Sequence, residues 1–185
     1  MNIETEAKIR VERFDEIIQR LESNKANCLG CFEEHDVYFK DRENRLMETG
    51  CGLRLRRKFN ETSDKTLLTF KGARLKSVYK ARPEAQTYVE NYDEMLKILT
   101  ALEYSPLIEV KKSRQLWQIE HCEVCLDEVE MLGRFVEVEG PDEKEVEKVL
   151  GLLDLAASAH TATGYARMMS EFLGKQGSKS AEKED

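Results

Sequence analysis

The stretch Glu4-Thr5-Glu6-Ala7-Lys8 lies near the start of the chain and alternates between charged and uncharged residues. The alternation extends from Ile3 to Val11, with apolar or neutral residues at odd positions and charged residues at even positions. A period of two over this length predicts a β-strand with one apolar face and one charged face. An isolated strand of this kind is most often a surface strand with a solvated charged face. The stretch therefore indicates a functional site only if its pattern recurs elsewhere in the chain.

Three later segments repeat the charge pattern. Arg54 and Arg56 alternate with Leu53 and Leu55, Lys112 and Arg114 share a face, and Glu137 and Glu139 alternate with Val136 and Val138. Like charges two residues apart on a strand repel one another and need partners of opposite sign. If the four charged faces point into one space, they line a polar cavity in which the acids hold a divalent cation and the bases hold an anionic substrate. The recurrence therefore predicts a functional site.

Composition limits the class of protein. The chain has 185 residues, of which 41% are hydrophobic and 35% are charged. This length suits one domain, which we place at residues 1–173, followed by a polar tail at 174–185 that we expect to be disordered. The net charge of -7 argues against a general nucleic-acid-binding protein, because such proteins need a basic excess. No apolar run could span a bilayer, and the start does not resemble a signal peptide, so we expect a soluble, cytoplasmic protein with no membrane partner.

Four of the five cysteines form two Cys-x-x-Cys pairs, at 28–31 and 122–125. Two such pairs can supply the four thiolates of a zinc site. Their separation, however, is far from that of a zinc ribbon, and Cys122 and Cys125 point to opposite faces if they lie in a strand. We therefore favour buried, reduced thiols over zinc or a disulfide.

The spacing of apolar residues predicts the secondary structure of the remaining segments. Helices are expected at 14–24, at 92–102, after Asp142 as an N-cap, and at 165–173. Further strands are expected at 26–40, 53–59, 65–71, 78–89, 107–119, 122–129 and 134–139, and the segment 41–52 between two of them is expected to be a polar turn. Pro83 marks a bulge or a sheet edge. The helices do not alternate regularly with the strands, so an antiparallel α+β fold is predicted. An exposed sheet edge would allow a homodimer, although no stretch identifies the interface.

Several short motifs follow the first stretch in a defined order. They are Asp36-Val37-Tyr38-Phe39, Leu53-Arg54-Leu55-Arg56, Thr69-Phe70-Lys71-Gly72, Lys112-Ser113-Arg114, Leu126-Asp127 and Gly133-Arg134-Phe135-Val136-Glu137-Val138-Glu139. With Glu4-x-Glu6-x-Lys8, this series resembles the CYTH domain or triphosphate tunnel metalloenzyme family, and looks most similar to its class IV (CyaB-type) adenylate cyclases. Gly164-Tyr165-Ala166-Arg167 is similar to the closing Ser-Tyr segment of the family, with Gly164 in place of serine. The resemblance implies an eight-stranded antiparallel β-barrel, the triphosphate tunnel, with flanking helices.

The resemblance also implies roles for individual residues. It implies Mg²⁺ or Mn²⁺ as the cofactor, held by Glu4, Glu6, Glu137 and Glu139, with Asp127 as a further acidic ligand or positioning group. The implied phosphate-binding residues are Lys8, Arg54, Arg56, Lys71, Arg82, Lys112 and Arg114, and the implied catalytic residues are Lys8, Asp127 and Glu137. These residue types suit the task independently, because Mg²⁺ prefers oxygen ligands and basic side chains bind phosphate oxygens.

Two reactions are compatible with such a site. In an adenylate cyclase, the metal and an acid such as Asp127 or Glu137 help to deprotonate the ribose 3′-hydroxyl of ATP, which attacks the α-phosphorus to give cyclic AMP and pyrophosphate. In a triphosphatase, water attacks the terminal phosphorus of tripolyphosphate, thiamine triphosphate or a nucleoside triphosphate. We favour the cyclase. A non-enzymatic polyphosphate binder is a third hypothesis, but carboxylates beside an anion are unfavourable unless a metal lies between them.

Overall fold

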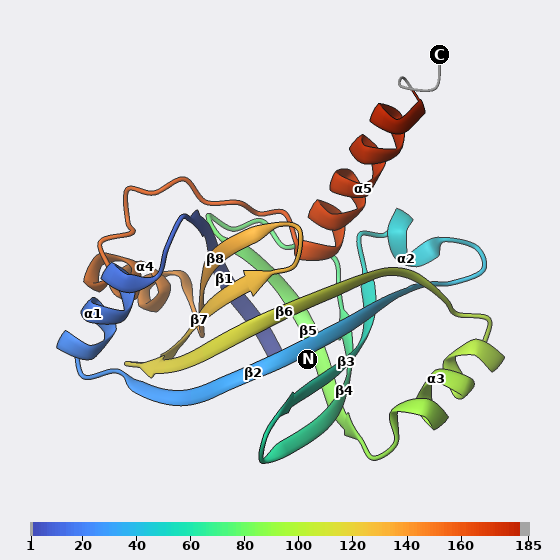
Figure 1. Cartoon of the computed structure of the whole chain (residues 1–185), viewed down its shortest axis with the longest axis horizontal. Coiled ribbons are helices and arrows are strands. Elements are labelled where there is room, and N and C mark those ends of the chain that lie inside the picture. The colour runs from blue at the N-terminus through green and yellow to red at the C-terminus, as the bar shows by residue number, and fades with distance from the viewer. Residues whose placement is uncertain (1, 182–185) are drawn as a thin grey trace.

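The computed structural model describes residues 2–181, and within them eight strands and five helices form (Figure 1). The strands are β1 (Asn2–Val11), β2 (Asn27–Lys40), β3 (Gly52–Asn60), β4 (Ser63–Lys71), β5 (Lys80–Val89), β6 (Ser105–Ile119), β7 (Cys122–Val129) and β8 (Gly133–Gly140). The helices are α1 (Asp15–Ser23), α2 (Arg45–Glu48), α3 (Tyr92–Ala101), α4 (Glu143–Leu152) and α5 (Tyr165–Ala181). Every expected strand is present.

The strands form one closed antiparallel barrel in the order β1-β5-β4-β3-β2-β6-β7-β8, and β8 pairs back with β1. This confirms the predicted α+β fold with an eight-stranded barrel. Because each of these strands pairs on both sides, the described part of the chain has no free sheet edge. The exposed edge that was expected to allow a homodimer is therefore absent.

Helices cover the barrel on several sides (Figure 1). The outer faces of β1, β7 and β8 carry apolar residues such as Ala7, Val136 and Val138, which pack in one cluster with Val146 and Val149 of α4 and with residues of α1. On the outer wall of β2 and β3, Phe39 and Leu55 pack against Leu99 of α3. Burial of these apolar outer faces under helices leaves the charged faces of the same strands to point inward.

The beginning of α5 packs against a separate part of the barrel. Tyr165 and Met169 form a buried cluster with Val110 of β6 and Phe135 of β8. From there the helix extends away from the barrel, as Figure 1 shows. The helix continues to Ala181, whereas a short helix ending near Leu173 and a disordered tail were expected. The polar composition of this segment does not prevent a helix from continuing beyond a docked first turn. Residues 182–185 of the expected tail lie outside the described residues.

Two local features can be compared with the predictions. The segment 41–52 contains the one-turn helix α2, because the carboxylate of Asp41 accepts hydrogen bonds from the backbone N–H groups of Glu43, Arg45 and Leu46. Pro83 lies at no bulge, since it pairs in regular register with Ile3 of β1, but it does lie at a local edge, because the paired residues of β4 and β5 end at Glu84. Its carbonyl accepts a hydrogen bond from Gly72, but proline has no N–H to return, and the β4–β5 pairing ends at this point.

The predicted N-cap of α4 is confirmed. Asp142 caps α4, because its side chain accepts hydrogen bonds from the N–H groups of Lys144 and Glu145 at 2.9 and 3.0 Å. The cysteines are free, and Cys122 and Cys125 are buried, whereas Cys28 and Cys31 are exposed and so depart from the expected burial. None of the helices in residues 2–181 has the length and apolar character needed to cross a membrane.

Candidate active site in the barrel interior

The barrel encloses a charged cavity of about 1280 Å³. The strand register aligns the side chains of this cavity, because directly paired residues of antiparallel strands point to the same face. Glu6 pairs with Glu139 and Lys8 with Glu137 across β1 and β8, and Glu4 pairs with Arg82 across β1 and β5. The predicted site residues that line the cavity are Glu4, Glu6, Lys8, Arg54, Arg56, Lys71, Arg82, Lys112, Arg114, Glu137 and Glu139. The hypothesis that the charged faces share one space is confirmed.

Lys8 lies between two carboxylates. Its Nζ is 3.0 Å from Oε1 of Glu6 and 2.8 Å from Oε1 of Glu137. Lys80 binds the other oxygen of Glu6, and Arg114 binds the other oxygen of Glu137. Burial favours the neutral acids, but the charges of Lys8 and Lys80 outweigh it and lower the pKa of Glu6 to about 2. Against the same effect of burial, Lys8 and Arg114 hold the pKa of Glu137 well below its ordinary value, so both acids are ionised at neutral pH.

Two further acids, Glu4 and Glu139, have fewer basic side chains around them. Glu139 forms no ion pair within residues 2–181, and burial together with the charges of Glu4 and Glu137 raises its pKa well above the ordinary value. Burial also raises the pKa of Glu4, although Nζ of Lys71 lies 3.6 Å from its Oε2. A divalent cation would relieve this repulsion, and carboxylate oxygens are the donors that Mg²⁺ and Mn²⁺ prefer. Glu4, Glu137 and Glu139 therefore suit the metal ion that the family resemblance implies.

The basic residues of β3 and β6 have acidic partners of their own. Arg56 binds Asp36 through two hydrogen bonds of 2.6 and 2.7 Å, and its Nη1 lies 2.8 Å from Oε2 of Glu34. Nζ of Lys112 lies 3.3 Å from the same Glu34 oxygen. Burial raises the pKa values of Glu34 and Asp36, but Arg56 and its neighbours lower them by more. The charge of the expected phosphate-binding residues on these strands is thus partly neutralised within the protein.

Asp127 occupies a different position from the other acids. It is fully buried and is not among the residues that line the cavity. Arg114 donates two hydrogen bonds of 2.6 Å to its carboxylate, and Lys112 and the hydroxyl of Tyr165 each donate one of 2.9 Å. Of the two roles that the resemblance implies for Asp127, metal ligand and positioning group, this environment favours the positioning group.

Arg82 and Arg74 are basic residues without an acidic partner in the described part of the chain. The Nε of Arg82 is buried and has no hydrogen-bond partner. Burial and the positive charges of Arg82 and Arg167 lower the pKa of Arg74. Arg167 pairs with Glu171 at 3.0 Å on the exposed face of α5. The repulsion that Arg82 and Arg167 exert on Arg74 beside the cavity would be relieved by an anion bound there.

Several cavity residues were missed by the sequence analysis. Glu34 repeats the charge alternation on β2, and Lys80 repeats it on β5 beside the predicted Arg82, so the pattern used elsewhere could have found them. Arg74 and Tyr165 lie outside the strands, and the alternation gives no signal for them. They reach the cavity only because the β4–β5 connection and α5 fold back onto the barrel.

Comparisons with known proteins agree with this arrangement. A family model described as the CYTH domain matches residues 2–165. A protein of Methanocaldococcus jannaschii named "Putative adenylate cyclase MJ0240" is 27% identical over 150 residues, which cover 80% of this chain and 83% of that protein.

Solved structures share the fold. The PH1012 protein of Pyrococcus horikoshii OT3 superposes with a TM-score of 0.77 at 26% identity, covering 90% of this chain and 99% of that one. For the PH1819 protein of the same organism the TM-score is 0.80 at 24% identity, with 91% and 98% covered. HpAC1 from Hippeastrum, whose structure is reported to reveal a dominant triphosphatase activity, has a TM-score of 0.65 at 17% identity, with 95% and 96% covered.

Proposed function

Because this chain belongs to the CYTH domain family, we propose that it is a divalent-metal-dependent enzyme that acts on the triphosphate group of a small molecule. The reaction that we propose is the conversion of ATP to cyclic AMP and pyrophosphate. One observation carries the proposal: the crowded acids lie beside cations that form no ion pair within residues 2–181, since Glu4 stands opposite Arg82 in the register of β1 and β5. A triphosphate with its metal ion supplies the opposite charge to both groups at once.

The residues of the cavity have different roles in the proposed reaction. A bound Mg²⁺ or Mn²⁺ would neutralise phosphate charge as it develops in the reaction. Arg82 and Arg74 bind phosphate oxygens, because neither has an acidic partner in residues 2–181 to release first. Of the two acids expected to accept the proton of the attacking hydroxyl, only Glu137 lines the cavity, so we assign the proton to Glu137. Lys8 holds Glu137 in place through its 2.8 Å ion pair.

Hydrolysis of the triphosphate is the second candidate. The same charges hold a triphosphate whether water or a ribose hydroxyl attacks it, so they favour neither reaction. HpAC1 shares the fold, and its structure is reported to reveal a dominant triphosphatase activity. This fold therefore supports hydrolysis in at least one protein. A purely non-enzymatic polyphosphate binder is disfavoured, because Glu4 and Glu139 would weaken binding of the anion unless a metal ion lay between them.

Product analysis separates these candidates. The purified protein is incubated in separate tubes with ATP, tripolyphosphate and thiamine triphosphate, each with Mg²⁺ or Mn²⁺, and the products are resolved by chromatography. Cyclic AMP and pyrophosphate from ATP would support the cyclase, whereas orthophosphate without cyclic AMP would identify a triphosphatase. Glu137→Gln and addition of EDTA are the controls, and both should abolish the product. The absence of product in every tube would contradict an enzymatic function.

A further inference from the structure

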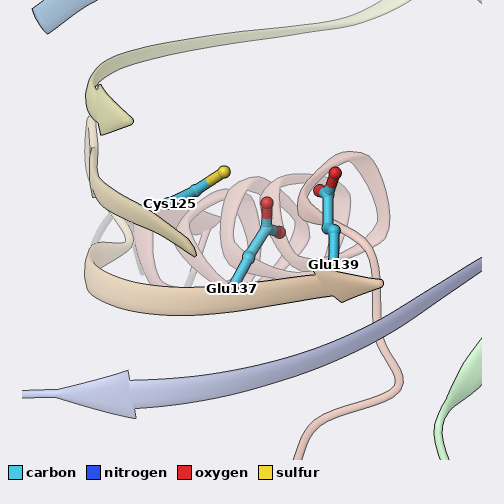
Figure 2. Close-up of side chains that lie close together, drawn as sticks. All are labelled: Cys125, Glu137 and Glu139. Carbon is cyan, nitrogen blue, oxygen red and sulfur yellow. The ribbon is translucent and has the colours of Figure 1, made fainter. Parts of the chain in front are cut away.

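Cys125 lies in the barrel beside the acids of β8 but has no part in the proposed reaction. It pairs directly with Glu137 across β7 and β8, so both side chains point to the same face. Figure 2 shows the sulfur of Cys125 directed toward the carboxylates of Glu137 and Glu139. Its Sγ and one carboxylate oxygen from each acid all lie within 4.8 Å of one another. One sulfur and two carboxylate oxygens therefore lie close together in one small volume.

The thiol of Cys125 has no partner that explains its orientation. The residue is 0% exposed, and its sulfur makes no hydrogen bond within the described residues. Glu139 likewise forms no ion pair there. Cys122, three residues earlier on β7, instead packs in the apolar cluster with Val146 and Val149 of α4. An unpartnered thiol that faces an acid without a counter-cation is an environment that a soft cation can complete.

We propose that Cys125, Glu137 and Glu139 form a binding site for a thiophilic divalent cation, Zn²⁺ or Cd²⁺. Zn²⁺ accepts thiolate sulfur and carboxylate oxygen together, whereas Mg²⁺ takes oxygen ligands. On binding, the thiol releases its proton to the solvent and its sulfur donates an electron pair to the cation, so no redox step is involved. The two oxygens of Glu137 contact Lys8 and Arg114, but each carboxylate oxygen has a second lone pair for the cation.

A soft cation bound at this site would also inhibit the enzyme. Glu137 and Glu139 also belong to the set of acids that suits Mg²⁺, so a cation held by these two carboxylates competes with Mg²⁺ for the same ligands. Zn²⁺ or Cd²⁺ therefore excludes Mg²⁺ and inhibits turnover. This inhibitory consequence rests on the proposed function, whereas the binding site itself does not.

Direct binding of Cd²⁺ tests the site without any triphosphate. The exposed Cys28 and Cys31 can themselves bind soft cations, so the test protein carries Cys28→Ser, Cys31→Ser and Cys51→Ser. Cd²⁺ is titrated while the ultraviolet charge-transfer absorbance of the cadmium–thiolate bond is recorded. We expect the band to saturate at one equivalent, to disappear in Cys125→Ser and to persist in the matched control Cys122→Ser. Excess Mg²⁺ should weaken the apparent Cd²⁺ affinity.

Two results would overturn the proposed site: a band that survives in Cys125→Ser, or a band that does not saturate near one equivalent of Cd²⁺. If circular dichroism shows that Cys125→Ser does not fold, Glu139→Gln decides the matter. That variant should bind Cd²⁺ at least about tenfold more weakly, and unchanged affinity would refute the site. Since absorbance requires no catalysis, failure of the cation site leaves the proposed triphosphate reaction unaffected, and failure of the reaction leaves the cation site standing.

Discussion

Arg56 and Asp36 form a two-point ion pair inside the barrel, in which Nε donates to Oδ1 at 2.6 Å and Nη2 donates to Oδ2 at 2.7 Å. Arg56 is only 8% exposed and Asp36 only 2%. Burial opposes both charges, yet Asp36 and Glu34 raise the pKa of Arg56 well above its ordinary value. A residue expected to bind phosphate is therefore also part of the structure of the barrel wall.

Replacing Arg56 should destabilise the fold. Arg56→Ala leaves Asp36 and Glu34 buried with fewer cations, and breaking a buried pair in this way costs roughly 3–5 kcal/mol of the free energy of unfolding. Urea denaturation measures the change. Arg57→Ala is the matched control, because Arg57 lies on the exposed face and pairs there with Asp64, so little change is expected. Equal denaturation midpoints for the two variants would contradict a structural role for Arg56.

Acid should destabilise the protein through Glu34 and Asp36. Burial raises their pKa values, but Arg56 first among the charges lowers them below those of the unfolded chain. Such groups stabilise the fold above their unfolded pKa, and this stability is lost as the pH falls through the folded pKa. We expect the thermal midpoint to fall steeply below about pH 5. Glu34→Gln should flatten this profile, and an unchanged acid slope in that variant would be evidence against the ion-pair origin.

Mg²⁺ should stabilise the protein more at higher pH. Burial, Glu4 and Glu137 raise the pKa of Glu139, so in the metal-free protein its stability contribution is present at low pH and is lost as the pH rises through the folded pKa. A divalent cation requires the ionised acid, and its stabilising effect should grow as the pH rises above the ordinary pKa range of a glutamate. Thermal unfolding with and without Mg²⁺ measures this effect.

Two variants complete that experiment. Glu139→Gln should lose most of the Mg²⁺-dependent shift, whereas Glu128→Gln should keep it, because Glu128 lies on the exposed face of β7 and pairs with Arg134. A full Mg²⁺ shift in Glu139→Gln would place the metal ion elsewhere.

Removing the hydroxyl of Tyr165 should have a smaller effect. Tyr165→Phe deletes the 2.9 Å hydrogen bond to Asp127 but keeps the ring over Nζ of Lys8, 4.0 Å from the ring centroid. A lost hydrogen bond to a buried charged group costs roughly 1–3 kcal/mol of the free energy of unfolding. Denaturant unfolding provides the measurement, with the exposed Tyr88→Phe as the control. A Tyr165→Phe variant as stable as Tyr88→Phe would show that Asp127 does not depend on this bond.

Much of the barrel could be predicted from the sequence because the strand period also encodes the two faces. Ala7 and Val136 mark the outer wall, and Lys8 and Glu137 mark the inner one, so the alternation alone predicted which charges share the cavity. Closure of the barrel could not be predicted in this way, because the pairing of β1 with β5 and β8 depends on residues distant in sequence. The prediction of a free sheet edge was wrong for that reason.

The sequence did not predict which charged residues of the cavity form ion pairs with one another. A charge on a strand does not reveal whether its partner is a ligand or another side chain, and Arg56 and Arg114 have buried acids while Arg82 has none among residues 2–181. The distinction arises from the order of strands around the barrel, which brings β2 between β3 and β6. It matters for experiment, because removing a paired cation also perturbs the fold.

Binding of tripolyphosphate to Arg82→Ala tests most directly whether the barrel interior is a triphosphate site. Within residues 2–181 the Nε of Arg82 has no hydrogen-bond partner and its guanidinium forms no ion pair, so this substitution breaks no buried ion pair there. In calorimetric titrations with Mg²⁺, we expect one tripolyphosphate per wild-type chain, at least about tenfold weaker binding in Arg82→Ala, which corresponds to about 1.4 kcal/mol, and wild-type affinity in the outer-wall control Arg134→Ala. Equal affinity of wild-type protein and Arg82→Ala, with both folded, would contradict a triphosphate site in the barrel.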